Sequence, residues 1–262
     1  MIATLGAMAF SLRYVWYEPA PLWVPISLLL AYLCLLFLGV MVPRLEMFAD
    51  IVWRGPKNRP EVALTFDDGP HVAHTSEVLQ ILERRNTVAT FFVIGWKAAR
   101  HPDILRAMLA QGHAIGIHGY QHDRYLGLRS KDRIVRDLAQ AIDVVERITG
   151  QRPWLYRPAV GQVSPTVARA CEQLGLTIVG WSARGFDGLK KAQPRRVAAR
   201  IISDVRPGAI VLLHDAAEVG DRKPAGVDAL EAVLAAIDDR ALRAVLVQRF
   251  VDKQMPVRES QA

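Results

Sequence analysis

One uncharged stretch near the amino terminus constrains this chain more than any other feature. No charged residue lies between Glu18 and Arg44, and residues 22–42 are almost wholly apolar. A run of this length can cross about 30 Å of hydrocarbon as a helix, and apolar runs of about 18 residues or more are rare in soluble cores. We therefore expect a membrane anchor at 1–44 with one span at about 22–42. A buried core helix is the alternative.

The residues around this run bear on its topology. The first apolar run, 1–12, is short for a span, so residues 1–17 form either a second crossing or an interfacial segment. A cleaved signal peptide fits poorly because no basic region precedes this run. More basic residues follow the span than precede it: Arg13 on one side, and Arg44, Arg54, Lys57 and Arg59 on the other. This bias favours a cytoplasmic location for the domain that follows.

Composition and charge narrow the class of the rest of the chain. With 51% hydrophobic residues the chain can bury a sizeable core, so it is not disordered as a whole. Its two cysteines, Cys34 and Cys171, can form neither a disulfide framework nor a cysteine zinc cluster. The net charge of +7 arises entirely after residue 50. The basic residues are scattered and no nucleic-acid motif accompanies them, so we expect no nucleic-acid partner.

After a segment with Gly and Pro punctuation at 45–58, which we interpret as a linker, short apolar runs alternate with helical patterns. The expected strands are 62–66, 89–94, 114–118, 154–157, 177–181, 209–214 and 244–247. The expected helices are 75–85, 102–111, 130–149, 164–174, 194–205 and 225–238. Repeated strand–helix units predict a parallel sheet covered on both faces. We expect a distorted seven-stranded (β/α) barrel over 59–251 and a tail at 252–262, with an open doubly wound sheet as the alternative fold.

Polar side chains stand at or just beyond the carboxyl ends of five expected strands. They lie in the segments TFDDGP (65–70), HGYQH (118–122), YRPAVG (156–161), WSARGFDG (181–188) and LLHD (212–215). In a (β/α) barrel these ends converge on one mouth, where active sites are built. Core packing does not explain ionisable groups at that end of five strands, so we expect a functional site there.

A metal site is the chemistry that these side chains favour. His118 and His122 are four residues apart, so one helical turn would put both rings on one side. Two imidazoles with a carboxylate from Asp67 or Asp68 match a catalytic zinc site that keeps one open position. The other carboxylate would take a proton from a metal-activated water, and His214 is the candidate acid for the leaving group.

In order and spacing, the five segments resemble the motifs of the polysaccharide deacetylases, carbohydrate esterase family four, over about 59–251. The resemblance implies a distorted (β/α) barrel that hydrolyses an N-acyl group, most often acetyl, on an amino sugar. It also implies one divalent metal ion, Zn²⁺ or alternatively Co²⁺, held by Asp68, His118 and His122.

The resemblance implies roles for further residues. Asp67 would be the base, and Arg157 would hold it in place. His214 would be the acid, and Asp187 would tune its protonation. The backbone N–H of Val160 would help to stabilise the oxyanion.

The substrate pocket is where the sequence departs most from the family. The resemblance implies that Leu212 forms the wall for the acyl methyl group, and it places Trp181 in the same pocket. Gly119 stands where the family commonly has Ser or Thr, which removes a brace of the metal loop. Val160 stands where the family commonly has Tyr, and Gly188 where an aromatic residue often follows the tuning aspartate. The loss of two aromatic side chains predicts a groove less suited to stacking on a standard glycan.

Together these inferences predict a membrane-anchored, metal-dependent N-deacetylase acting on a glycan or a lipid-linked sugar. Deformylation or O-deacetylation of a glycolipid is an alternative activity. A catalytically silent, membrane-tethered glycan-binding module is an alternative of another class. The usual substrates of the family, wall glycans, lie outside the cell, so the resemblance implies an extracytoplasmic domain although the Lys and Arg bias implies a cytoplasmic one.

Overall fold

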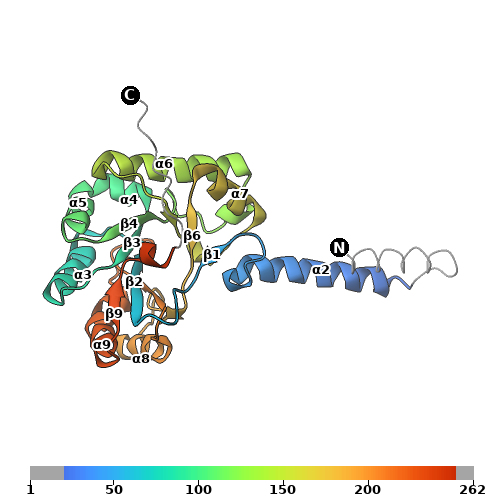
Figure 1. The fold of residues 1–262 in the computed structure, drawn as a ribbon. Coiled ribbons are helices and arrows are strands. Elements are labelled where there is room, and N and C mark those ends of the chain that lie inside the picture. Colours follow the sequence, from blue (N-terminus) through green and yellow to red (C-terminus); the bar gives the residue numbers. More distant parts are fainter. Residues whose placement is uncertain (1–20, 252–262) are drawn as a thin grey trace.

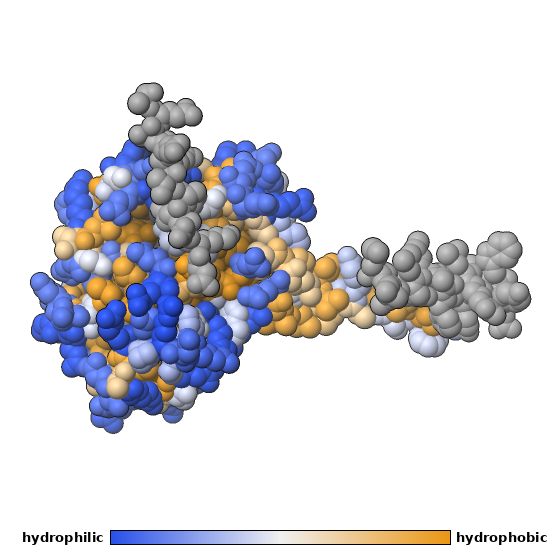
Figure 2. Space-filling model, viewed as in Figure 1, coloured by the Kyte–Doolittle hydropathy of each residue, from blue (hydrophilic) through white to orange (hydrophobic). Residues whose placement is uncertain are grey.

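The computed structural model describes residues 21–251, which form a helical rod and a rounded domain (Figure 1). The rod is helix α2 (Trp23–Met41), whose mean hydropathy reaches 2.5 and whose apolar side chains are mostly exposed (Figure 2). Its 19 residues rise about 28 Å, close to the ~30 Å of bilayer hydrocarbon. The helix is therefore long and apolar enough to cross a membrane. The second expected crossing, at 1–17, and the tail 252–262 lie outside the described residues.

The described part of the rounded domain is built on one curled sheet of nine strands, all paired in parallel. Their spatial order is β1-β6-β5-β4-β3-β2-β8-β7, with β9 paired to β2. The strands are β1 (Ile51–Val52), β2 (Glu61–Asp67), β3 (Thr90–Val93), β4 (Ala114–Ile117), β5 (Leu155–Tyr156), β6 (Thr177–Val179), β7 (Ala183–Arg184), β8 (Ile210–His214) and β9 (Arg243–Val245). Only residues 180–182 separate β6 from β7, which lie toward opposite edges of the sheet, so the sheet curls almost into a barrel. The expected distorted barrel is confirmed in this incompletely closed form.

Two of these strands are absent from the sequence-based prediction. β1 and β7 have two residues each, so the signal for a strand is weak at both. β1 also lies inside the segment 45–58 interpreted as a linker. Ile51 and Val52 pair with β6, and Arg54 forms a bridge to Ala209 near β8. The sheet therefore takes up part of that segment.

Helices pack around the outside of the curled sheet (Figure 1), and residues 51–251 contain seven of them. They are α3 (Val72–Arg84), α4 (Gly95–Arg100), α5 (Pro102–Ala110), α6 (Lys131–Thr149), α7 (Pro165–Leu174), α8 (Pro194–Asp204) and α9 (Ala225–Asp239). All except the short α4 correspond to expected helices.

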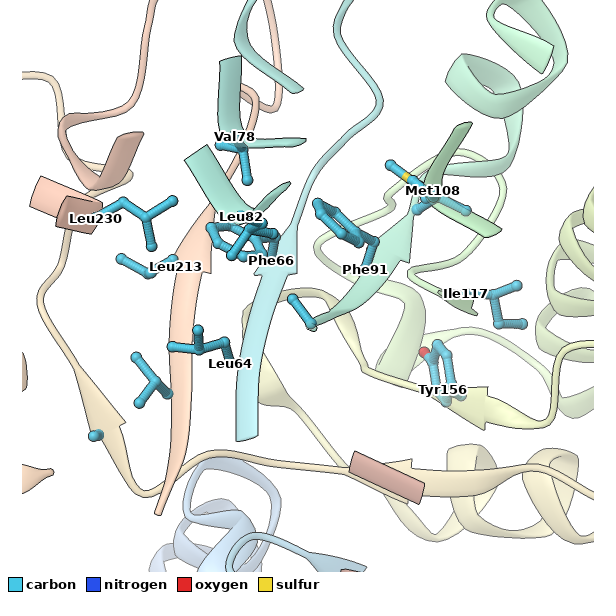
Figure 3. Close-up of a cluster of buried hydrophobic side chains, with 14 of the residues drawn as sticks. Leu64, Phe66, Val78, Leu82, Phe91, Met108, Ile117, Tyr156, Leu213 and Leu230 are labelled. Atoms are coloured by element: carbon cyan, nitrogen blue, oxygen red, sulfur yellow. The ribbon is translucent and has the colours of Figure 1, made fainter. Parts of the chain in front are cut away.

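Alternation along β2 decides which of its side chains meet the helices. Leu64 and Phe66 point outward into the main core, where Phe66 stacks on Phe91 at 5.1 Å (Figure 3). Ala63 belongs to a smaller cluster inside the curl. Because side chains on a strand alternate, Asp67 shares the face of Ala63 and reaches the interior of the curl at its carboxyl end.

Candidate active site

A cavity of about 730 Å³ opens at the carboxyl ends of the strands. It collects nine of the ten residues that the sequence analysis proposed for the site: Asp67, Asp68, His118, His122, Val160, Trp181, Asp187, Leu212 and His214. The tenth, Arg157, is completely buried and contacts the cavity through Asp67. The fold therefore brings the segments singled out in the sequence to one place.

Three side chains with metal-binding atoms converge in this cavity. One such atom from each of Asp68, His118 and His122 lies within 4.8 Å of the others. Oδ1 of Asp68 is 3.2 Å from Nε2 of His122 and 3.5 Å from Nε2 of His118, yet it accepts no hydrogen bond. Buried polar atoms normally have hydrogen-bond partners. A buried carboxylate oxygen that faces two imidazole nitrogens without such a bond fits a divalent cation.

The surroundings of the two histidines also suit a metal. Nδ1 of His118 lies 2.6 Å from the carbonyl oxygen of Arg157 and donates to it, which leaves the lone pair of Nε2 facing the cavity. Burial lowers the pKa of His118, so its ring is neutral at neutral pH. Nδ1 of His122 lies 3.1 Å from Oε1 of Glu218. The negative charge of a carboxylate so close to the ring makes the imidazole a more basic ligand.

The segment between the two histidines is a loop, so the expectation that a helical turn aligns their rings is wrong. Gly119 (φ +85°) and His122 (φ +57°) adopt left-handed conformations that a helix excludes. The carboxylate of Asp137, on α6, accepts the N–H groups of Tyr120 at 2.8 Å and Gln121 at 3.2 Å. This carboxylate braces the loop, and a Cβ at Gly119 would lie only 3.0 Å from it.

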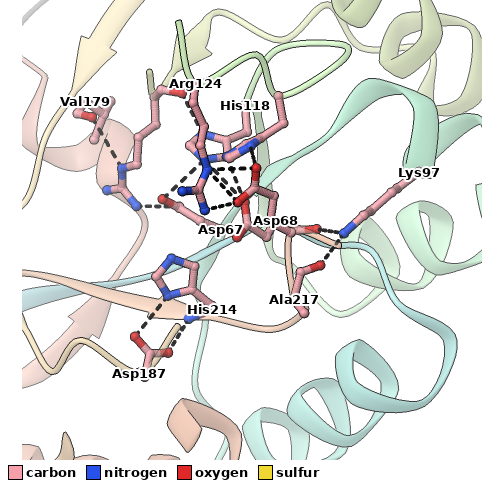
Figure 4. A network of polar contacts seen from close by, with 12 residues as sticks. Asp67, Asp68, Lys97, His118, Arg124, Val179, Asp187, His214 and Ala217 are labelled. Carbon is pink, nitrogen blue, oxygen red and sulfur yellow. Dashed lines mark hydrogen bonds and ion pairs between the residues drawn. The ribbon is translucent and has the colours of Figure 1, made fainter. Parts of the chain in front are cut away.

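Asp67 and Asp68 share the cavity because the backbone turns between them. Neighbouring residues on a strand point to opposite faces, but Asp68 has a φ of +72° and so departs from strand geometry. The buried Lys97 secures this turn, since its Nζ donates to the carbonyl oxygens of Asp68 at 2.8 Å and Ala217 at 2.7 Å (Figure 4). A Cβ at Gly69 would collide with the carboxylate of Asp215, so the turn also requires glycine there.

Arg157 holds Asp67 from inside the sheet. Its Nη1 donates to Oδ1 of Asp67 and to the hydroxyl of Thr65, both at 2.7 Å. Its other nitrogens donate to the carbonyl oxygens of Val179 at 3.3 Å and Gly180 at 2.8 Å. The guanidinium is thus fixed by four groups, and it fixes Asp67 in one orientation while Oδ2 lies 3.9 Å from Nε2 of His118.

His214 and Asp187 form a second partnered pair in the cavity (Figure 4). Oδ1 of Asp187 lies 2.9 Å from Nδ1 of His214, and its Oδ2 accepts the backbone N–H of the same residue at 2.7 Å. Burial by itself lowers the pKa of His214. The charge and hydrogen bond of Asp187, with smaller contributions from Asp68 and Asp67, outweigh burial and raise this pKa to about 10. His214 therefore carries a proton at neutral pH.

Backbone strain is concentrated around this cavity. Of the seven non-glycine residues with positive φ among those described, four line it: Asp68, His122, Val160 and Phe186. Val160, at φ +51°, is the costliest because a β-branched side chain disfavours this conformation. Strain of this kind persists where the surrounding structure enforces it, and it gathers at functional sites.

Three residues that support the site are absent from the sequence-based prediction. Glu218 lies behind His122 and is itself held by Nε of Arg124 at 2.9 Å. Lys97 holds the backbone of the turn at Asp68. Asp137 holds the loop between His118 and His122. Their sequence neighbourhoods resemble ordinary charged surface. Only Asp137 could have been singled out from the sequence, because it directly precedes Leu138, a residue of the apolar face of its helix.

Known proteins share sequence and fold with this chain. The polysaccharide deacetylase family model matches residues 54–179. A peptidoglycan-N-acetylglucosamine deacetylase of Bacillus cereus is 30% identical over 209 residues, which cover 79% of this chain and 95% of the relative. A chitooligosaccharide deacetylase of Azorhizobium caulinodans is 34% identical over 161 residues, or 61% of this chain and 75% of the relative.

Solved structures show the same fold. A peptidoglycan N-acetylglucosamine deacetylase in complex with an N-oxidanyl-benzamide matches with a TM-score of 0.72 at 28% identity, covering 77% of this chain and 92% of its own. A family 4 acetyl xylan esterase from Clostridium thermocellum, solved with a cobalt ion, matches with a TM-score of 0.66 at 31% identity. The match covers 72% of this chain and 89% of the esterase chain. Fold and site together define a hydrolase of the carbohydrate deacetylase class. The chain belongs to the polysaccharide deacetylase family.

Proposed function

We propose that this chain is a metal-dependent hydrolase that removes the N-acetyl group from an amino sugar. One observation carries the proposal: a single cavity holds the Asp68–His118–His122 cluster together with a carboxylate fixed by arginine and a histidine kept protonated by a carboxylate. Amide hydrolysis needs a base for the attacking water and an acid for the departing amine.

The residues divide this work as follows. A divalent ion, Zn²⁺ or Co²⁺, held by Asp68, His118 and His122 would activate a water molecule and polarise the acyl carbonyl. Asp67, oriented by Arg157, accepts a proton from the attacking water. His214 donates its proton to the nitrogen of the sugar as the carbon–nitrogen bond breaks. The N–H of Val160 stabilises the negative charge that develops on the acyl oxygen.

The pocket walls suit a small acyl group. Leu212 lines the cavity and is 7% exposed, so it offers a short apolar wall to a methyl group. Trp181 lines the same cavity and packs against Gly161, where a Cβ would lie 2.5 Å from the ring. The named relatives act on N-acetylglucosamine in peptidoglycan and on chitooligosaccharides, which supports an N-acetylated amino sugar as the substrate.

Helix α2 anchors this hydrolase in a membrane, with the catalytic domain on the extracytoplasmic side. Its length and hydropathy support the anchor, and the relatives that act on peptidoglycan support that side, although the basic residues after the span favour the opposite one. A reporter enzyme fused after Ala262, active only outside the cytoplasm, tests the orientation. Activity of a cytoplasm-specific reporter at the same position would reverse it.

A turnover assay with N-acetylated, N-formylated and O-acetylated sugars tests the activity. We expect hydrolysis of the N-acetyl sugar to exceed that of the other two, and we expect Asp67→Asn to lower it by about 10²–10⁴-fold. Preference for the formyl or the O-acetyl sugar would make the chain a deformylase or an O-deacetylase. Binding of a glycan without turnover of any of the three would make it a silent binding module.

A further inference from the structure

A second cavity lies beside the active site, between the end of α2 and the catalytic domain. Its volume is about 440 Å³, and three arginines line it: Arg44, Arg184 and Arg200. We name it the arginine cleft. Met41 and Val42 at the end of the apolar helix, together with Trp53, add apolar surface, and Asp204 adds one negative charge.

The arginine cleft shares a wall with the catalytic cavity. Trp181, Arg184 and Phe186 line both spaces. Nη2 of Arg44 donates to the carbonyl oxygens of Trp181 at 3.4 Å and Ser182 at 3.1 Å, directly after the carboxyl end of β6. The end of α2 therefore lies against the turn between β6 and β7, whose Trp181 forms part of the wall of the catalytic cavity.

The three arginines have no carboxylate partner among the described residues. Arg44 lies over the ring of Trp53 at 5.3 Å, while Arg184 and Arg200 lie over the ring of Phe186 at 4.2 Å and 5.6 Å. Burial, and then the charge of Arg44, lower the pKa of Arg184. Neighbouring guanidinium groups that repel one another and keep free N–H donors are suited to an oxyanion such as phosphate.

The depth of the arginine cleft matches the position of lipid phosphates. Met41 and Val42 end the apolar run and also line the cleft. The backbone N–H of Val163 donates to the carbonyl oxygen of Val40 at 3.1 Å, so the domain lies directly against the end of the helix. With α2 across a bilayer, the cleft lies at the level of the headgroups.

The rim of the catalytic cavity is apolar in the same region. Seven large hydrophobic residues are exposed within 50–251, and four of them line this cavity: Val160, Phe186, Leu189 and Val219. Three of the four are aliphatic and cannot stack on sugar rings. Exposed aliphatic side chains next to basic groups suit the boundary between headgroups and acyl chains.

We propose that the arginine cleft binds the phosphate group of a lipid-linked N-acetylated amino sugar, whose sugar then enters the adjoining catalytic cavity. This inference rests on the proposed N-deacetylase activity and names its substrate as a lipid phosphate or diphosphate that carries the sugar. Because the two spaces share a wall, we expect the phosphate in the cleft to belong to the substrate and not to a separate phospholipid. Only a substrate needs to occupy the cleft and the catalytic cavity at once.

Kinetics on two substrates test this inference with the full chain in neutral detergent. One substrate is a polyprenyl diphosphate that carries N-acetylglucosamine. The other is tetra-N-acetylated chitotetraose, called chitotetraose below, which has neither phosphate nor lipid. We expect Arg200→Gln to lower the ratio of kcat/KM for the lipid substrate to that for chitotetraose by about tenfold or more, as loss of a charge-assisted phosphate contact does. Arg196→Gln, an equal charge change one turn earlier on α8, should leave the ratio unchanged. An unchanged ratio in Arg200→Gln overturns the proposal.

A binding measurement separates failure of this inference from failure of the proposed activity. Protein fluorescence reports binding while polyprenyl phosphate is added. The signal of the wild-type chain should saturate. The affinity of Arg200→Gln should be at least tenfold weaker than that of Arg196→Gln. Equal affinity for phosphatidylglycerol or for inorganic phosphate would make the cleft a general phosphate site and overturn the substrate assignment. If neither substrate turns over, the proposed activity fails, while this titration still decides whether the cleft binds a lipid phosphate.

Discussion

The catalytic cavity and the arginine cleft share a wall, but charged side chains are paired with opposite charges in the first and not in the second. In the cavity, Asp67 is paired with Arg157 and His214 with Asp187. In the cleft, the guanidinium groups meet carbonyl oxygens and aromatic rings instead of carboxylates. Pairing fixes the orientation and the protonation of a group that must react. A cation without a carboxylate partner keeps its charge for a ligand, so the contrast separates a region built for chemistry from one built for recognition.

Removal of the divalent ion should have the largest effect on hydrolysis in the catalytic cavity and no effect on binding in the arginine cleft. We expect chelation to reduce hydrolysis of chitotetraose to background and Zn²⁺ or Co²⁺ to restore it, because Asp68, His118 and His122 would lose the group that activates water. Elemental analysis alongside the assay checks metal content, which should fall sharply in His122→Ala. Binding of polyprenyl phosphate should persist in the metal-free chain. Full activity without metal would contradict the mechanism.

Asp67→Asn should lower kcat/KM by about 10²–10⁴-fold, because a general base contributes roughly this much. The change keeps the shape of the side chain, so metal content and thermal stability are measured together with activity. Asp239→Asn, on the exposed end of α9, is the matched control and should behave as the wild type. Near-normal activity of Asp67→Asn would show that the two adjacent carboxylates do not divide the work as proposed.

Asp187→Asn should change the pH dependence of kcat/KM rather than abolish activity. In the proposed mechanism His214 acts in its protonated form, and Asp187 is the main group that raises its pKa. Without that negative charge, burial lowers the pKa. Above the new pKa the active fraction falls about tenfold per pH unit, so the alkaline limb of the rate profile should move to lower pH. The acidic limb should stay in place. An alkaline limb that does not move would remove Asp187 from this role.

Deletion of residues 1–44 should have the smallest effect on the chemistry. The sheet and the proposed catalytic residues all follow this segment. We expect a chain soluble without detergent, with kcat/KM on chitotetraose within about threefold of the full chain, as for a domain with its own core. The same deletion removes Arg44 and the helical wall of the cleft, so the lipid substrate should be used less well. Loss of both activities in a folded truncated chain would make α2 part of the catalytic site.

How much of this molecule could be predicted depends on how long and how regular the sequence pattern of each element is. The apolar run of β2 and the helical period of α6 are examples of the signals that predicted the parallel barrel, and the polar strand ends predicted the residues of the cavity. The two-residue strands β1 and β7 carry no period. The loop that presents His122 was mistaken for a helical turn because four-residue spacing is typical of helices, whereas its path depends on the distant carboxylate of Asp137.

The arginine cleft could not be predicted for a related reason. Arg44 lies 140 residues before Arg184 in the chain, and only the docking of α2 against the turn after β6 brings the two together. Each arginine taken alone has the sequence context of ordinary solvated surface. The same holds for Lys97 and Glu218, whose partners are a backbone carbonyl and an imidazole on other loops.

The short connection between α2 and the sheet limits where this protein can work. Only residues 42–50 separate the helix from β1, a distance of at most about 30 Å even when fully extended, and Arg44 ties this segment to the turn after β6. With α2 in a bilayer, the active site cannot travel into the depth of a cell wall. Its encounters would then take place by lateral diffusion in two dimensions, and its rate would follow the surface density of substrate in the membrane rather than the concentration in bulk solution.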